Sequence, residues 1–187
     1  TPTITNNASA SYPVATNYVT WGATDAAGNT SLCVQTVIVV DDQLPSLVVS
    51  PITRQLDVNG DYTLNSTDIA AIISATGDNC GIQTTNFSQT VFNFCHVGVN
   101  NVTVTLTDVH GNVSNAVVAI TIDPPPTPTV VYVDDDYPNA CAAVNFPSNG
   151  LSGPYYVGFN AFKTIQAGLD AVAASGATAD TRSPRPP

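Results

Sequence analysis

The stretch Asn101-Val-Thr-Val-Thr-Leu-Thr107 alternates polar and apolar side chains, and Asp108-Val-His-Gly-Asn112 follows it directly. The alternation resumes over 113–122. A period of two is typical of a half-buried antiparallel strand. Gly111 can take a positive φ and Asp108 can accept bonds from the backbone ahead of it, so a tight turn is expected between the two runs. The whole segment therefore predicts a β-hairpin.

The same hairpin pattern occurs earlier in the chain, over 19–40. Its turn, Asp25-Ala-Ala-Gly-Asn29, matches residues 108–112 at an offset of 83, and a one-residue gap then brings Asp41 opposite Asp123. Several such strands within about 80–100 residues predict a β-sandwich. The first copy has about 11 residues before its hairpin motif, whereas the second has about 50. Because half a sandwich exposes strand edges and an apolar face, we expect the first copy to be cut from a longer protein or completed by another segment or subunit.

The composition indicates a secreted, mainly β protein. The 187 residues include 14 acids, all of them aspartate, against 4 basic residues, and the net charge is −10. The scarcity of Lys and Glu excludes a mostly helical protein, and the scarcity of Lys and Arg excludes a nucleic-acid partner. No run approaches about eighteen apolar residues, so no membrane-spanning segment is expected. The chain starts without Met and without a signal-like segment, which predicts a processed or excised segment.

The sequence changes character after residue 123. Pro124-Pro-Pro-Thr-Pro128 predicts a stiff, extended linker, and Thr129-Val-Val-Tyr-Val133 is a β-prone run. One helix is expected over 161–174, between a capping Asn160 and a terminating Ser175-Gly176. Its apolar stripe consists of Phe162, Ile165, Leu169 and Val172.

Several motifs together carry a resemblance to known families. In the first copy they are Tyr12-Pro-Val, Ala23-Thr-Asp-Ala-Ala-Gly-Asn29, Cys33 and Val40-Asp-Asp-Gln-Leu-Pro45. In the second they are Leu56-Asp-Val-Asn-Gly60, Asp78-Asn-Cys-Gly-Ile82, Cys95-His-Val-Gly98 and 107–112. Residues 1–123 thus resemble the hyalin-repeat (HYR) and related bacterial Ig-like surface repeats. This resemblance implies extracellular adhesion or spacing rather than catalysis.

The C-terminal part carries a second resemblance. Residues 131–137 and 161–172 are similar to the N-terminal cap of a right-handed parallel β-helix, a solenoid found in adhesins and polysaccharide lyases. A lyase site of that family would lie downstream, so no catalytic residue is carried over. With only His96 and His110 as histidines and no glutamate, the chain is expected not to be an enzyme.

The predicted fold class is mainly β, with Ig-like β-sandwich modules and a small C-terminal β/α segment that carries one helix. The predicted units are a partial HYR/Ig-like half domain at 1–43, an Ig-like sandwich at 44–123, a Pro-rich linker at 124–129, a β-helix-cap-like strand and helix at 130–180, and a tail at 181–187.

The four cysteines form no C-x-x-C pair, which favours disulfides in an extracellular setting over zinc. The resemblance to Ig-like repeats implies a bond between Cys80 and Cys95. For the remaining two we hypothesise a Cys33–Cys141 bond, through which strand 129–133 or its neighbours would complete the half sandwich, within one chain or between chains. The alternatives are free thiols and a truncated fragment.

Two groups of residues are candidate calcium ligands. The loop from 57 to 68 places oxygen ligands at EF-hand spacing and resembles a dockerin loop, although Tyr62 replaces the usual glycine. Its ligands would be Asp57, Asn59, Asp61, Asn65 and Asp68. The alternative is an ordinary Asn-Gly turn. Asp41 and Asp42 lie at a domain junction, as in calcium-bridged adhesion repeats, and Asp134–Asp136 is a further acidic cluster; the alternative for each is a solvated acidic surface.

Six N-x-S/T triplets are candidate glycosylation sites. They begin at Asn7, Asn29, Asn65, Asn86, Asn101 and Asn112.

The predicted function is that of an extracellular structural or adhesive protein, a subunit of a surface or secreted fibre assembled by strand complementation. Self-association is expected to be head-to-tail, and a glycan or cell-surface molecule is a candidate ligand. The alternatives are an accessory Ig-like fragment of a larger secreted carbohydrate-active enzyme, or a glycan-binding module that uses Trp21 as a stacking platform; a core role for Trp21 is the simpler interpretation.

Overall fold

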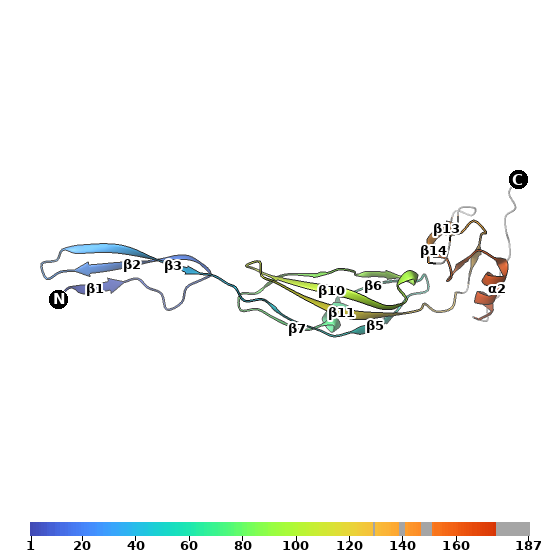
Figure 1. Ribbon diagram of the computed structural model, residues 1–187, viewed down its shortest axis with the longest axis horizontal. Helices are drawn as coiled ribbons and strands as arrows, with labels where there is room; N and C mark the ends of the chain where they lie inside the picture. The colour runs from blue at the N-terminus through green and yellow to red at the C-terminus, as the bar shows by residue number, and fades with distance from the viewer. Residues whose placement is uncertain (129, 139–140, 147–150, 175–187) are drawn as a thin grey trace.

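The computed structural model describes residues 1–128, 130–138, 141–146 and 151–174. These residues form an elongated, mainly β molecule with an N-terminal sheet at one end, a β-sandwich in the middle and a strand-and-helix module at the other end (Figure 1). The predicted fold class is confirmed.

The N-terminal sheet has three antiparallel strands in the order β1 (Thr3–Asn6), β2 (Ala15–Thr24) and β3 (Thr30–Val39). Its β2–β3 hairpin pairs Thr24 with Thr30 and continues to Ala15 and Val39. The Asp25–Asn29 turn closes it, with Gly28 at φ +89°. No second sheet covers this sheet within the described part of the chain.

The sandwich has one sheet of four strands in the order β5 (Ile52–Gln55), β11 (Val113–Asp123), β10 (Gly98–Asp108) and β8 (Ile82–Phe87). Two strand pairs add to it: β4 (Ser46–Val49) with β7 (Ile73–Gly77), and β6 (Asp61–Thr63) with β9 (Val91–Asn93). A short helix, α1 (Ser66–Ile72), and a 3-10 turn, η1 (Phe94–His96), complete this unit.

The core of the sandwich is built from the alternating positions that the sequence predicted on β10 and β11, together with residues of the preceding segment. Each fully buried aliphatic or aromatic side chain contributes about 1.5–3 kcal/mol relative to exposure. The buried cluster consists of Leu56, Leu64, Ile72, Phe92, Val102, Val104, Val118, Ile120 and Ile122.

The two hairpins have the same strand register. Thr24 pairs with Thr30 in one and Thr107 with Val113 in the other, so the offset of 83 persists along both strands. The predicted one-residue gap is therefore absent from the strands themselves.

The C-terminal module pairs β12 (Tyr132–Val133) with β15 (Ala161–Phe162) in parallel and β13 (Ala143–Phe146) with β14 (Leu151–Tyr156) in antiparallel. Within this chain, strand β12 therefore does not complete the N-terminal half sandwich, which was one form of the hypothesis for 129–133 and its neighbours. It is held by β15, from the same module.

The helices differ from the prediction in number and extent. The expected helix is α2 (Ile165–Ala173), capped by Thr164 instead of Asn160, because Ala161 and Phe162 are taken up by β15. Helix α1 was not predicted. The terminator predicted for α2, Ser175-Gly176, and the predicted tail at 181–187 lie outside the described residues.

Candidate metal centre at the junction

Three segments meet where the N-terminal sheet joins the sandwich. Asp41 lies in the linker after β3, Asp78 lies in the turn between β7 and β8, and Asp108 ends β10. One carboxylate oxygen from each lies within 4.8 Å of the other two. The junction therefore concentrates three carboxyl groups.

Asp108 is fully buried and organises the β10–β11 turn. Its Oδ1 accepts from the backbone N–H of His110 (2.8 Å) and of Asn112 (2.8 Å), and its Oδ2 accepts from Asn112 Nδ2 (2.7 Å). Burial alone would raise the pKa of Asp108, but these hydrogen bonds, led by the one from the Asn112 side chain, lower the pKa below its ordinary value. The carboxylate is therefore ionised at neutral pH.

Asp78 holds the turn before β8 in the same way, with one oxygen left over. Its Oδ1 accepts from the N–H of Cys80 (2.8 Å) and of Gly81 (2.9 Å). Its Oδ2 is buried and has no hydrogen-bond partner within the described residues. Such an orphaned buried carboxylate oxygen is costly, and a bound cation would satisfy it.

Asp41 ties the linker to the sandwich. Its side chain is 1% exposed, and its Oδ2 lies 3.1 Å from His110 Nδ1. Its backbone carbonyl accepts from Asn112 Nδ2 (3.1 Å). Asn112 therefore bridges the linker and the Asp108 carboxylate with one amide nitrogen.

This donor set suits a hard divalent cation. Three carboxylates repel one another unless a cation lies between them, and calcium prefers oxygen ligands from carboxylates and carbonyls. A second grouping, of Asp41 with Cys80 and His110, would suit zinc only with an ionised thiol. A hydrogen bond with Asp41, together with burial, raises the pKa of the Cys80 thiol. The oxygen grouping is therefore the better metal site.

The sequence predicted Asp41 as a junction ligand, treated Asp108 as a turn residue and named Asp78 only within the motif Asp78–Ile82. Asp42, the other predicted junction ligand, is exposed and belongs to neither grouping. The Asp-x-x-Gly pattern of Asp78–Gly81 and Asp108–Gly111 marks turns, but it also occurs at Asp25–Gly28 and Asp57–Gly60, so it could not single out a metal site. Asp134–Asp136 also forms a compact acidic group, but these residues are adjacent in sequence, and the buried unpartnered atom beside them is the hydroxyl oxygen of Tyr137 rather than a carboxylate oxygen.

The residues of the predicted calcium loop at 57–68 form a turn and a helix cap instead. Asp57 closes an Asn-Gly turn by accepting from Asn59 N (2.8 Å) and Asp61 N (3.0 Å), with Gly60 at φ +87°. Asn65 caps α1 and accepts from Asp68 N (3.1 Å). The five predicted calcium ligands of this loop therefore have separate structural roles. The alternative interpretation, an ordinary Asn-Gly turn, describes Asp57–Asp61.

Asp68, the last predicted ligand of that loop, is 1% exposed and fully engaged. Arg54 Nε donates to its Oδ1 (2.6 Å), while Tyr62 OH (2.6 Å) and Asn65 N (2.9 Å) donate to its Oδ2. Burial opposes ionisation, yet these donors lower the pKa of Asp68 below its ordinary value. The group is a structural ion pair of the sandwich.

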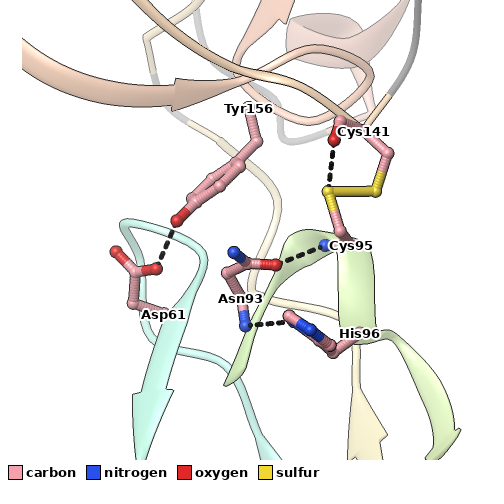
Figure 2. Close-up of a disulfide and its surroundings, with 6 residues drawn as sticks. All are labelled: Asp61, Asn93, Cys95, His96, Cys141 and Tyr156. Carbon is pink, nitrogen blue, oxygen red and sulfur yellow. Dashed lines mark hydrogen bonds between the residues drawn. A yellow bond between two sulfur atoms is a disulfide. The ribbon is translucent and has the colours of Figure 1, made fainter. Parts of the chain in front are cut away.

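The disulfide connects the sandwich to the C-terminal module and corrects both predicted pairings. Cys95, in η1, is bonded to Cys141 (Figure 2). Cys33 and Cys80 are free. The predicted Cys80–Cys95 bond is wrong because Cys80 lies in the turn at the opposite junction, beside Asp41. The predicted Cys33–Cys141 bond is wrong because Cys141 is taken by Cys95. A bond with a sequence separation of 46 predicts about 4 kcal/mol of stabilisation by chain entropy.

Aromatic and polar contacts reinforce this second junction. Phe159 stacks on Phe94 with ring centroids 5.4 Å apart, and Tyr156 OH donates to Asp61 Oδ1 at 2.5 Å (Figure 2). Burial and the neighbouring carboxylate raise the pKa of Tyr156 to about 12. Gly60 is closely covered, since a Cβ there would lie 3.1 Å from Tyr156 and 3.2 Å from Phe159.

Trp21 lies half-buried on the N-terminal sheet, where its Nε1 donates to Gln35 Oε1 (2.8 Å). A shallow hollow of about 210 Å³ lies beside it, lined in part by Ile4, Leu32 and Cys33. Its volume is below the usual range of about 300–1,000 Å³ for small-molecule sites.

Most of the six candidate glycosylation asparagines are exposed. Asn112 is the exception, because it is half-buried and its Nδ2 is committed to Asp41 and Asp108. A glycan on Asn112 would break the junction contacts.

Within the described part of the chain, no helix has the length and apolar character needed to cross a membrane.

No family model and no curated protein match this chain. Among the solved structures that are similar to part of it are the following two. "Protocadherin gammaB7 EC3-6 cis-dimer structure" is 13% identical over 71% of this chain and 40% of that chain, with a TM-score of 0.30. "Protocadherin Gamma B2 extracellular cadherin domains 3-6" is 17% identical over 74% of this chain and 41% of that chain, with a TM-score of 0.27. The chain spans about two fifths of these structures, and likenesses of this size define neither fold family nor function.

Proposed function

We propose that the chain is an extracellular structural or adhesive module whose first junction is held rigid by calcium. The elongated arrangement, the acidic composition and the disulfide support a spacer that works outside the cell. The observation that carries the cation is the buried, unpartnered Oδ2 of Asp78, whose carboxyl group belongs to the same three-residue cluster as those of Asp41 and Asp108.

Calcium would act mechanically rather than catalytically. Asp41 comes from the linker, and Asp78 and Asp108 come from the sandwich, so one ion bound to all three would fix the angle between sheet and sandwich. Without the ion, carboxylate repulsion would favour separation of the linker from the sandwich.

The test is a calcium titration of the full chain by calorimetry, with thermal melts in calcium and in EDTA. Asp78→Asn is the informative variant, because an amide oxygen still accepts from Cys80 and Gly81 while the charge is lost. Asp123→Asn, an exposed aspartate at the other end of the sandwich, is the matched control.

We expect one calcium per chain, weakened at least about tenfold by Asp78→Asn and unchanged by Asp123→Asn. Absence of calcium binding, or equal binding by both variants, would contradict the proposal. Tight zinc binding that is lost on Cys80→Ser would instead assign the metal site to the grouping of Asp41, Cys80 and His110.

A second candidate, an accessory module of a secreted carbohydrate-active enzyme, is supported by the C-terminal module. We base this candidate on β12, β15 and α2, because they lie in the two segments that carry the resemblance to a β-helix cap. Retention of the chain on an insoluble polysaccharide, with loss on Trp21→Ala, would instead favour the glycan-binding role.

A further inference from the structure

Strand β3 is an open edge. It ends the β1-β2-β3 sheet, and no strand pairs with its outer side among the described residues. Its ten residues, Thr30–Val39, contain no charge, proline or glycine, which are the features that usually discourage edge-to-edge pairing. The strand is thus an unprotected template for another strand.

The equivalent edge in the second hairpin is covered. There β11, the counterpart of β3, pairs in parallel with β5 from Ile120–Ile52 to Asp123–Gln55. By the offset of 83, this covered segment corresponds to the C-terminal part of β3. The same hairpin therefore has a neighbour in one copy and an exposed edge in the other.

The backbone groups that point outward can be assigned. Asp25 N donates to Asn29 O, which makes this opposed pair hydrogen-bonded, and hydrogen-bonded and non-hydrogen-bonded pairs alternate along an antiparallel ladder. The backbone N–H of Thr20 donates to Asn7 Oδ1, and the backbone C=O of Thr20 accepts from Asn7 N, so both groups point away from β3. Thr20 and Val34, which lie opposite each other, are therefore a non-hydrogen-bonded pair. The outward N–H and C=O groups of β3 are therefore those of Thr30, Leu32, Val34, Thr36 and Ile38.

Apolar side chains accompany these groups. Leu32, Val34 and Ile38 share one face of β3, with exposures of 68%, 62% and 68%, and Tyr18 on β2 is 66% exposed on the same face. A contiguous exposed apolar surface of this kind marks an interaction site.

Charge favours a second copy of this chain as the partner. Only Asp25 of the 14 aspartates lies among residues 1–40, so nearly all the negative charge lies in the sandwich and beyond. Two copies repel each other least when they meet at this end. The N-terminal sheet lies at the end of the molecule farthest from the C-terminal module (Figure 1), so antiparallel pairing points the two acidic sandwiches in opposite directions.

We propose that two copies pair through β3 in antiparallel orientation, forming one six-stranded sheet about a twofold axis at Val34. This register uses most of the strand: Thr30 pairs with Ile38, Leu32 with Thr36, and Val34 with Val34 of the other copy. The inference goes beyond the proposed function and needs no cation. An isologous contact closes as a dimer, in contrast to the head-to-tail polymer that the sequence predicted.

The first test is sedimentation velocity of the full chain in EDTA, which separates it from the calcium test. We expect a dimer of twice 19.3 kDa. Val34→Pro removes an N–H that is used only between copies, at an edge position where proline is tolerated. It should raise the dimer dissociation constant at least about tenfold, whereas Val34→Thr should not. Circular dichroism of both variants checks the fold.

A chain that stays monomeric, a ladder of higher multimers, or a dimer that Val34→Pro leaves intact would overturn the proposal.

The second test is cross-linking by a short bismaleimide in a Cys80→Ser background. At this register the two Cys33 thiols are diagonal neighbours on one face, about 7–8 Å apart. We expect a covalent dimer that is lost in Cys33→Ser; failure to cross-link a sedimenting dimer would exclude the register.

Discussion

The β2–β3 and β10–β11 hairpins share a turn and a register but differ in what covers them. In the second, Val102, Val104 and Leu106 are fully buried. Their counterparts are Val19, Trp21 and Ala23, and only Val19 is buried to a similar degree. The difference comes from the segment before β8, which supplies β4 to β7 and α1 in the second copy and has no counterpart around the first in the described chain.

This comparison separates local from tertiary contributions. The turns Asp25–Asn29 and Asp108–Asn112 have the same side-chain and backbone bonds, so five residues are enough to specify the turn. Burial, in contrast, depends on distant residues. Matched substitutions in the two hairpins measure how much stability each contribution supplies.

The largest effect is expected in the core. Ile120→Ala should lower the free energy of unfolding of the sandwich by about 3 kcal/mol, because Ile120 is fully buried. The counterpart Val37→Ala should cost less than about 1 kcal/mol, since Val37 is only half-buried.

Urea unfolding followed by circular dichroism measures both variants. Trp21, the sole tryptophan, reports on the N-terminal sheet separately. Equal losses for Ile120→Ala and Val37→Ala would mean that the first hairpin is covered as well as the second.

A smaller effect is expected at the last turn position. Asn112→Ala should cost about 2 kcal/mol, because it removes a donor from buried Asp108 and breaks the bond to Asp41. Asn29→Ala should cost about 0.5 kcal/mol, because Asn29 and Asp25 are exposed. Thermal denaturation of the two variants, side by side, checks the ratio; a larger loss for Asn29→Ala would contradict it.

The smallest effect at neutral pH concerns the turn carboxylates. Hydrogen bonds lower the pKa of both Asp25 and Asp108 below the ordinary value of 3.8. A lowered folded-state pKa stabilises the fold above 3.8, and that stabilisation disappears as the pH falls through the folded-state value.

Stability should therefore be flat near neutrality and fall below about pH 4. Urea midpoints between pH 6 and pH 3 measure this loss. The stability of Asp108→Asn should decline less steeply with falling pH than that of the native chain. An unchanged decline would mean that another group causes the acid sensitivity. Asp68 would be the next candidate, because its pKa is also lowered.

Local patterns in the sequence predicted the strands and turns of both hairpins, because a period of two and an Asp-x-x-Gly turn act over a few residues. Helix α1 escaped prediction because Asn65-Ser-Thr-Asp68 was interpreted as metal-binding oxygens. In the structure these residues form a capping box, in which Asn65 accepts from Asp68 N and Asp68 accepts from Asn65 N. The Asn-x-x-Asp pattern before Ile69-Ala-Ala-Ile72 was the available signal.

The disulfide and the metal centre depend on how modules meet, which sequence spacing does not encode. Cys80 and Cys95 lie fifteen residues apart but at opposite ends of the sandwich, so proximity in sequence was misleading. Likewise, Asp41 gathers Asp78 and Asp108 only because the linker enters between two turns. Those contacts could be found only once the fold had placed the turns side by side.

The Cys95–Cys141 bond has a consequence for a chain under tension. Strands β10 and β11 lie between the two cysteines, so a pull on the chain ends passes through the sulfur atoms and leaves the loop of 46 residues unstretched. At about 3.3 Å per extended residue, the bond withholds roughly 150 Å of contour length. Reduction would release that length and add it to the extension that the strands before Cys95 already permit.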